Sequence, residues 1–185
     1  MIMICKTEFC TGCAACANRC EREAISMLPD GRGFLRPVID QSLCVDCGLC
    51  VRVCPQIERK YPESDSKIFA ALAKDDSIRA NSSSGGLFSL LAEKTLLEGG
   101  VVFGAAMGDD LCVRHVMVNK CEELRLLRGS KYVQSEIGDC YKQVEGHLKS
   151  GTKVLFSGTP CQVDALKHFL GMEYDPNLDI PSQSD

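Results

Sequence analysis

The chain is organised around Cys10-Thr-Gly-Cys13-Ala-Ala-Cys16-Ala-Asn-Arg-Cys20 and around its repeat, Cys44-Val-Asp-Cys47-Gly-Leu-Cys50-Val-Arg-Val-Cys54-Pro55. Each stretch has the pattern C-x2-C-x2-C-x3-C, and the four cysteines recur at a constant offset of 34 residues. An offset that holds at four positions indicates an internal repeat. Cysteine thiolates at this spacing are typical ligands of iron–sulfur clusters. We therefore predict two [4Fe–4S] clusters related by a pseudo-twofold axis.

The spacing also predicts which cysteines share a cluster. Three cysteines at i, i+3 and i+6 in a tight loop can bind three corners of one cubane, whereas the fourth begins a short helix and points away. In two-cluster ferredoxins this fourth cysteine binds the other cluster. We therefore expect one cluster to be held by Cys10, Cys13, Cys16 and Cys54, and the other by Cys44, Cys47, Cys50 and Cys20. Such crossed ligation makes metal binding and folding of the segment one event.

Two other uses of the eight cysteines are weaker. Zinc sites also contain C-x2-C pairs, but a third cysteine at i+6 and a fourth at i+10 are surplus to one tetrahedral ion. A disulfide framework is typical of small secreted scaffolds. The first repeat has Glu21 where the motif usually has proline, whereas the second has Pro55. That proline shapes the loop and donates nothing to iron, so the expected ligands are unchanged.

The composition favours a soluble protein of a reducing compartment. Of 185 residues, 45% are hydrophobic and 25% are charged, and the formal net charge is −4. This charge gives no indication of nucleic-acid binding. No secretory signal is visible and the longest apolar run, residues 99–108, is too short to cross a bilayer. Five scattered cysteines remain outside the repeat, an odd number that argues against disulfides: Cys5, Cys112, Cys121, Cys140 and Cys161. We expect a cytoplasmic location and no membrane span.

The predicted fold class is α+β, with a ferredoxin-like module over 1–58, a polar linker over 59–67 and an α/β part from residue 68. Residues 1–4 are expected to form a first strand, and residues 24–39 a hairpin around the turn at 29–33. Its apolar side chains are expected to shield the clusters from water; they are Ile25, Met27, Leu28, Phe34, Leu35, Val38 and Ile39.

Beyond the linker, apolar runs alternate with helical periodicity, which is typical of an α/β layer arrangement. Strands are predicted over 68–73, 101–107, 112–118 and 153–157, and helices over 84–98, 122–127, 138–149 and 162–170. The first of these helices has Leu87, Leu90, Leu91, Thr95 and Leu96 at helical spacing. Residues 68–151 are assigned to a first α/β domain, and residues 152–185 to the start of a second. Because the end is polar and little covers the last strand, we expect the chain to be C-terminally truncated.

Three motifs in the α/β part are candidates for ligand binding. A helix start rich in hydroxyls and glycines is suited to phosphates of a flavin or nucleotide, although an ordinary helix cap is the alternative; it comprises Ser83, Ser84, Gly85 and Gly86. Arg128 and Lys131 flank a glycine turn that either holds an anion or is a solvated basic loop. The third motif lies between a strand and a helix, where α/β sheets place ligands, and comprises Gly158, Thr159, Pro160 and Cys161.

Cys161 lies at a helix start, where the helix dipole favours its thiolate. It is therefore a ligand, a reactive thiol or a buried inert cysteine. The three histidines, His115, His147 and His168, have no metal-ligand spacing, and we interpret them as structural or surface residues.

The order of these motifs resembles the coenzyme F420 hydrogenase/dehydrogenase beta-subunit family, over roughly residues 5–170. The similarity lies in the cysteine repeat followed by Ser83-Ser-Gly-Gly-Leu-Phe88, Leu127-Arg-Gly-Ser-Lys-Tyr-Val-Gln134 and Ser157-Gly-Thr-Pro-Cys-Gln162. More narrowly, the chain is similar to bacterial members with an N-terminal two-cluster ferredoxin module. In that family the α/β part binds FAD and exchanges electrons with iron–sulfur clusters. Archaeal members reduce coenzyme F420 by hydride transfer, and a plant relative reduces a chlorophyll intermediate.

The resemblance implies an iron–sulfur flavoprotein oxidoreductase with a redox partner protein and an F420-like or other two-electron acceptor. It implies that the Ser83–Gly86 turn, Lys131 and the Gly158–Cys161 loop lie near the isoalloxazine ring or the phosphates of FAD. Family members continue into a longer C-terminal domain with further cysteines. We therefore expect the full-length protein to be an enzyme, whereas this fragment is expected to bind flavin weakly or not at all. The alternative is a ferredoxin-type electron carrier whose α/β part docks a partner.

Overall fold

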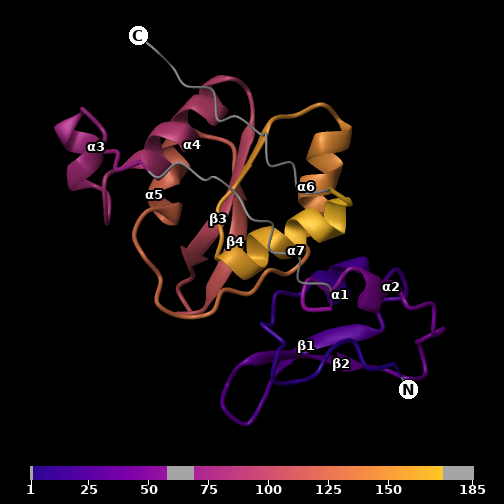
Figure 1. The fold of residues 1–185 in the computed structure, drawn as a ribbon. Coiled ribbons are helices and arrows are strands. Elements are labelled where there is room, and N and C mark those ends of the chain that lie inside the picture. Colours follow the sequence, from indigo (N-terminus) through magenta and orange to yellow (C-terminus); the bar gives the residue numbers. More distant parts are fainter. Residues whose placement is uncertain (1, 58–68, 173–185) are drawn as a thin grey trace.

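The structure is a computed structural model that describes residues 2–57 and 69–172. In Figure 1 the N-terminal module lies beside the end of the α/β part that carries α7. The predicted linker at 59–67 lies outside the described residues. Within the described ranges, no helix has the length and apolar character needed to span a membrane.

The N-terminal module consists of a hairpin and two short helices. Strand β1 (Ile25–Pro29) pairs antiparallel with β2 (Leu35–Ile39), and the helices are α1 (Ala15–Arg19) and α2 (Leu49–Arg52). The predicted hairpin is confirmed, and its turn is closed by the Asp30 carboxylate, which accepts the backbone N–H groups of Arg32 and Phe34. The strand predicted at 1–4 is wrong for the described residues 2–4, which pair with no strand. Ile4 is instead buried against the cysteine loops.

Only one face of the hairpin is turned toward the cysteines. Ile25 is buried, and Met27 and Ile39 pack against the same core. Leu28, Phe34 and Val38 are each about half exposed, because successive residues of a strand point to opposite faces. The prediction that all seven apolar hairpin residues shield the clusters is therefore wrong for these three.

The α/β part is built on a three-stranded sheet within the described residues. Strand β3 (Val101–Met107) lies between β4 (Val113–Val118), to which it is antiparallel, and β5 (Val154–Phe156), to which it is parallel. These three predicted strands are confirmed. Residues 69–73 form no strand, contrary to the prediction for 68–73, and Ile68 lies outside the described residues. The Ala73 N–H is bonded instead to the Gly85 carbonyl, which fixes the chain beside the serine–glycine turn.

The helices of the α/β part are α3 (Asp76–Ala80), α4 (Leu87–Leu97), α5 (Leu124–Leu127), preceded by a 3-10 turn at Cys121–Glu123, α6 (Cys140–Lys149) and α7 (Pro160–Leu170). Helices α4, α5 and α6 contact the sheet, whereas α3 lies apart from it (Figure 1). Helix α4 begins three residues later than predicted. Its buried residues are Ser89, Ala92 and Leu96, whereas Leu87, Leu90 and Leu91 are between 38% and 50% exposed.

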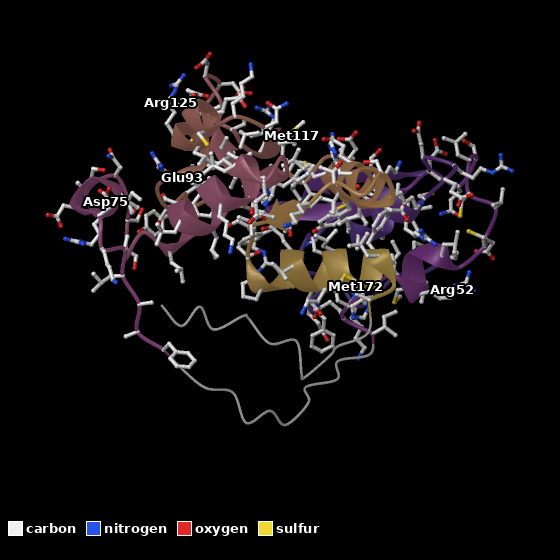
Figure 2. All side chains as sticks on the ribbon, turned by 90° about the horizontal axis from the view of Figure 1, so that it is seen from above. Arg52, Asp75, Glu93, Met117, Arg125 and Met172 are labelled. Atoms are coloured by element: carbon white, nitrogen blue, oxygen red, sulfur yellow. The ribbon has the colours of Figure 1, made fainter. Side chains whose placement is uncertain are left out.

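One hydrophobic core joins the two parts of the chain. It contains Cys16 and Cys50 of the N-terminal module together with Tyr141 of α6 and Phe169 of α7. Helix α1 packs against α6 and α7, and the Arg19 guanidinium lies 5.7 Å from the centre of the Phe169 ring. Figure 2 shows the opposite ends of the molecule, with Arg52 at the end of α2 and Asp75 at the start of α3. Through this shared core, the module that carries the cysteine loops is held against the α/β part.

Candidate functional site

The first predicted set of cysteines surrounds one cavity. Cys10, Cys13, Cys16 and Cys54 all line it, although Cys54 comes from the other repeat. Cys10 and Cys13 lie on the loop before α1, Cys16 on α1, and Cys54 just after α2. Gly12 has a φ of +66°, and a Cβ on it would lie 2.6 Å from the Leu35 carbonyl oxygen. Glycine is therefore required where this loop passes β2.

The second set lines a second cavity of about 140 Å³, formed by Cys20, Cys44, Cys47 and Cys50. Its loop repeats the backbone of the first. Gly12 and Ala14 have φ angles of +66° and +60°, and the residues 34 positions later, Asp46 and Gly48, have φ angles of +57° and +72°. Each cavity thus has the predicted crossed set of cysteines on its walls.

The thiols of both cavities fit iron–sulfur clusters in number and chemistry. A cubane binds each thiolate at a different iron, so its four ligands need not converge on one point. In the described ranges, no three or more His, Cys, Asp or Glu side chains are arranged to hold a single metal ion. Burial raises the pKa of Cys13 to about 11 and that of Cys16 further. A bound iron–sulfur cluster would provide the positive charge that stabilises these buried thiolates.

A larger cavity of about 710 Å³ adjoins the first cysteine set. Its walls include the backbone at 11–13, the loop at 127 and 129–135, and residues 157–159, 161 and 162. The Gln134 side chain holds the first two walls together, because its amide donates to the Thr11 carbonyl and accepts the Leu35 N–H. Cys13 and Cys161 both line this cavity. Two of the three predicted ligand motifs are therefore brought to the first cysteine loop.

The third motif, Ser83–Gly86, lines a neighbouring cavity of about 430 Å³. The two cavities share five wall residues, namely Phe88, Leu127, Gly129, Ser130 and Ser157. Gly86 begins α4 with a φ of +83°, and no described side chain caps the N–H groups of its first turn. The Ser83 hydroxyl accepts the backbone N–H of Ser130, which ties two of the motifs together. Gly86 is itself the N-cap of α4, which also fits the alternative of an ordinary helix cap with glycines.

The two cations of the second motif are already engaged by the protein. The Arg128 guanidinium donates to the Glu93 carboxylate at 2.9 Å and to the Ser89 hydroxyl at 3.1 Å. The Lys131 ammonium donates to the carbonyls of Arg128 and Leu126, at 2.8 and 3.1 Å. Lys131 lines the larger cavity and Arg128 the smaller. Desolvation lowers the pKa of Lys131.

In the third motif, Thr159 and Gln162 form a capping box at the start of α7, and Pro160 occupies the first turn. Cys161 is half-buried, and its Sγ lies 3.1 Å from the Thr159 hydroxyl. It is close enough to Cys13 for the two thiols to interact electrostatically. Cys161 therefore lies on the cavity wall and is not fully buried.

A buried polar network beneath the larger cavity was not predicted from the sequence. His115 Nε2 lies 3.0 Å from the Ser157 carbonyl, and Nδ1 lies 2.9 Å from the Ser135 hydroxyl. Gln162 donates to that hydroxyl and accepts the Thr159 N–H. All these bonds are satisfied by a neutral His115 that carries its proton on Nε2. The histidine is structural, as expected, and it positions the loop at 157–159.

Acidification is expected to weaken this network. Burial lowers the pKa of His115 below its usual 6.5, partly opposed by its bond to the Ser157 carbonyl. A histidine whose pKa is lower in the folded than in the unfolded chain contributes to the free energy of unfolding. That contribution is complete when the pH is above the pKa of the unfolded chain, and it declines as the pH falls below that value. We expect the free energy of unfolding to fall more steeply from about pH 7 to 5.5 in the wild type than in His115→Gln. Equal slopes in urea titrations would contradict the assignment of a neutral imidazole.

Comparison with known proteins agrees with the two-part geometry. Residues 9–56 and residues 36–87 each match a family described as a 4Fe-4S dicluster domain. Residues 68–141 match the N-terminal domain of the coenzyme F420 hydrogenase/dehydrogenase beta subunit. The coenzyme F420-dependent sulfite reductase of Methanocaldococcus jannaschii is 29% identical over 177 residues, which are 92% of this chain and 27% of that protein. The chain thus spans about a quarter of its relative's length. The chain thus joins a part similar to 4Fe-4S dicluster domains to a part similar to the N-terminal domain of the coenzyme F420 hydrogenase/dehydrogenase beta subunit.

Proposed function

We propose that this chain passes electrons between its first [4Fe–4S] cluster and a flavin held in the two adjoining cavities. One observation carries the proposal: the cavity of about 710 Å³ has Cys13, an expected ligand of that cluster, on one wall and Lys131 and Cys161 on the others. Its volume is within the range of cofactor sites. Electron transfer needs the two redox groups close together, and a shared wall provides this.

The smaller cavity suits the phosphates of the flavin. Backbone N–H groups at the start of α4 point out of the helix without a described side-chain acceptor, and such groups bind anions. Gly85 has no room for a side chain, since a Cβ would lie 2.5 Å from the Ala71 carbonyl oxygen. The Arg128 guanidinium is already ion-paired with the Glu93 carboxylate. We therefore assign the phosphates to the backbone of Ser83–Gly86 rather than to that guanidinium.

The ring system of the flavin is assigned to the larger cavity. Its walls offer apolar surface from Phe88 and Leu127 and polar groups from Lys131 and Thr159. A bound flavin exchanges electrons singly with a cluster and in pairs with a hydride donor or acceptor. The protein's part is to fix the Cys13 loop beside the ring, which the Gln134 and Tyr141 hydrogen bonds do.

The two-electron partner is proposed to be a deazaflavin of the coenzyme F420 class. The support is the family and the relative named as an F420-dependent sulfite reductase. For the whole protein we propose an oxidoreductase activity, a redox partner subunit and a cytoplasmic location. Anaerobic assays with deazaflavin, nicotinamide and quinone acceptors would identify the partner.

Filling the larger cavity is expected to abolish flavin binding. Ala105 lines it from strand β3, and Ala105→Phe would place an aromatic ring in that space. We expect the affinity of the anaerobically reconstituted full-length protein for FAD, measured by quenching of flavin fluorescence, to fall roughly tenfold or more, because a filled cavity excludes the ligand. Iron content should be unchanged.

The matched control is Met107→Phe, on the same strand but about half exposed; it should leave the affinity for FAD unchanged. Saturable binding by the wild type, lost in Ala105→Phe alone, supports the proposal. A wild type that carries both clusters but binds no FAD would contradict the flavin assignment and favour the electron-carrier alternative.

A further inference from the structure

A fifth cysteine lines the first cluster cavity. Cys5 contributes to its wall together with Cys10, Cys13, Cys16 and Cys54. The Cys5 thiol is close enough to the thiols of Cys54 and Cys10 to interact with them electrostatically, most strongly with Cys54. The C-x2-C-x2-C-x3-C pattern does not include this residue, and the family similarity assigns it no role. Five cysteines thus line this cavity, one more than the four irons of a [4Fe–4S] cubane need as ligands.

The internal repeat shows that this fifth thiol is specific to one cluster. The offset of 34 residues pairs Cys5 with Ile39. Ile39 lines the second cavity, as Cys5 lines the first. Among the described residues that line the second cavity, the only cysteines are the four expected ligands. The pseudo-twofold relation therefore places a thiol and an isoleucine at matching positions beside otherwise matching ligand sets.

Cys5 borders a further cavity in addition to that of the first cluster. Cys5 lines this adjoining cavity of about 360 Å³ together with Arg36 and Cys10. Its own backbone segment is irregular rather than part of a strand or helix. The Arg36 guanidinium holds the Cys10 carbonyl, so the loop next to Cys5 is fixed, whereas Cys5 itself borders both cavities.

We propose that Cys5 is a reserve ligand of the first cluster, able to bind the iron corner otherwise held by Cys54. The exchange needs no change of oxidation state: the bond from iron to Cys54 sulfur breaks and a bond from iron to Cys5 sulfur forms. Cys5 loses its thiol proton, and the released Cys54 thiolate takes one up. The cluster beside the proposed flavin site is thereby protected against loss of one ligand. This inference rests on the proposed cluster ligands.

The test compares iron and labile sulfide in anaerobically purified wild type, Cys5→Ala, Cys54→Ala, the Cys5→Ala/Cys54→Ala double variant and Cys20→Ala. Cys20 is the counterpart of Cys54 in the repeat, and its cluster has no spare thiol on its cavity wall. We expect about eight irons per chain in the wild type, in Cys5→Ala and in Cys54→Ala. The double variant and Cys20→Ala should keep about half of that iron or less.

Peptide mapping after alkylation gives a second readout that does not depend on activity. Cys5 should react with iodoacetamide in the wild type and be protected in Cys54→Ala. If Cys54→Ala loses as much iron as Cys20→Ala, the reserve role is overturned.

If Cys54→Ala is insoluble, wild type and variant are refolded from denaturant with iron and sulfide. Failure of the variant alone would likewise overturn the reserve role. A wild type with no iron or sulfide would contradict the cluster ligands themselves, which distinguishes that failure from failure of the inference.

Discussion

Removal of iron under anaerobic conditions is expected to unfold residues 2–57 and to leave the sheet of the α/β part folded. The N-terminal module has helices of five and four residues and two five-residue strands. Isolated helices shorter than about 12–15 residues are marginal in water, as are single two-stranded hairpins. Three of its buried residues, Cys16, Cys50 and Cys54, are expected cluster ligands. Without metal, the module loses the centre of its core.

Hydrogen exchange read by mass spectrometry would follow this loss. On chelation, amide protection in β1 and α1 should fall by roughly a hundredfold or more, the signature of unfolding rather than of local fraying. Protection in β3, whose Val102 and Phe103 are fully buried, serves as the internal control and should change little. A module that keeps its protection after complete removal of iron would show that the protein core, rather than crossed ligation, holds it together.

The spacing of the repeat is a local property, and the grouping of cysteines that it predicts agrees with the cavities that they line. Crossed ligation places Cys54 with the first set and Cys20 with the second, and both lie on the expected cavities. The sequence signals for the turn at Pro29–Gly33 and for the strand at Val101–Met107 also lie within short stretches of the chain, and they were equally clear. By contrast, periodicity did not tell which side of α4 is buried, because the small residues Ser89 and Ala92 are buried beside Leu96, whereas Leu87, Leu90 and Leu91 are exposed.

The rest of the site depends on contacts between segments far apart in the sequence. His115, Ser135 and Gln162 come from different elements and meet only in the fold, so no spacing rule could join them. The approach of Cys161 to Cys13 is of the same kind. Cys5 is a partial exception, because the 34-residue offset already paired it with Ile39 beside the second cysteine set.

Removing the Tyr141 side chain is expected to separate the first cysteine loop from α7. Tyr141 is fully buried on α6, and its hydroxyl lies 3.0 Å from the Cys13 carbonyl and 3.1 Å from the Gln162 carbonyl. A phenol has one proton, so these two carbonyls share it. Burial raises the pKa of Tyr141, which keeps that proton in place. The ring also packs between Phe156 and Phe169.

Two substitutions divide these contributions. Tyr141→Phe keeps the ring but leaves two buried carbonyls without their donor, and is expected to lower the free energy of unfolding by about 1–3 kcal/mol. Tyr141→Ala also removes the ring and is expected to lower it by about 3–5 kcal/mol. Anaerobic urea titrations of the iron-loaded chain would measure both, with Tyr132→Phe, at a residue 94% exposed, as the control with little change.

The Cys13 carbonyl is the part of this arrangement that bears on function. If the hydroxyl bond fixes the loop, Tyr141→Phe should increase hydrogen exchange at residues 11–16 while leaving the loop around Cys44 unchanged. The second loop is the appropriate reference because it repeats the same backbone but has no counterpart of Tyr141 among its hydrogen-bond partners in the described residues. Equal effects on both loops would mean that Tyr141 stabilises the core in general. An effect confined to the first loop would show that α6 sets the position of the cluster next to the large cavity.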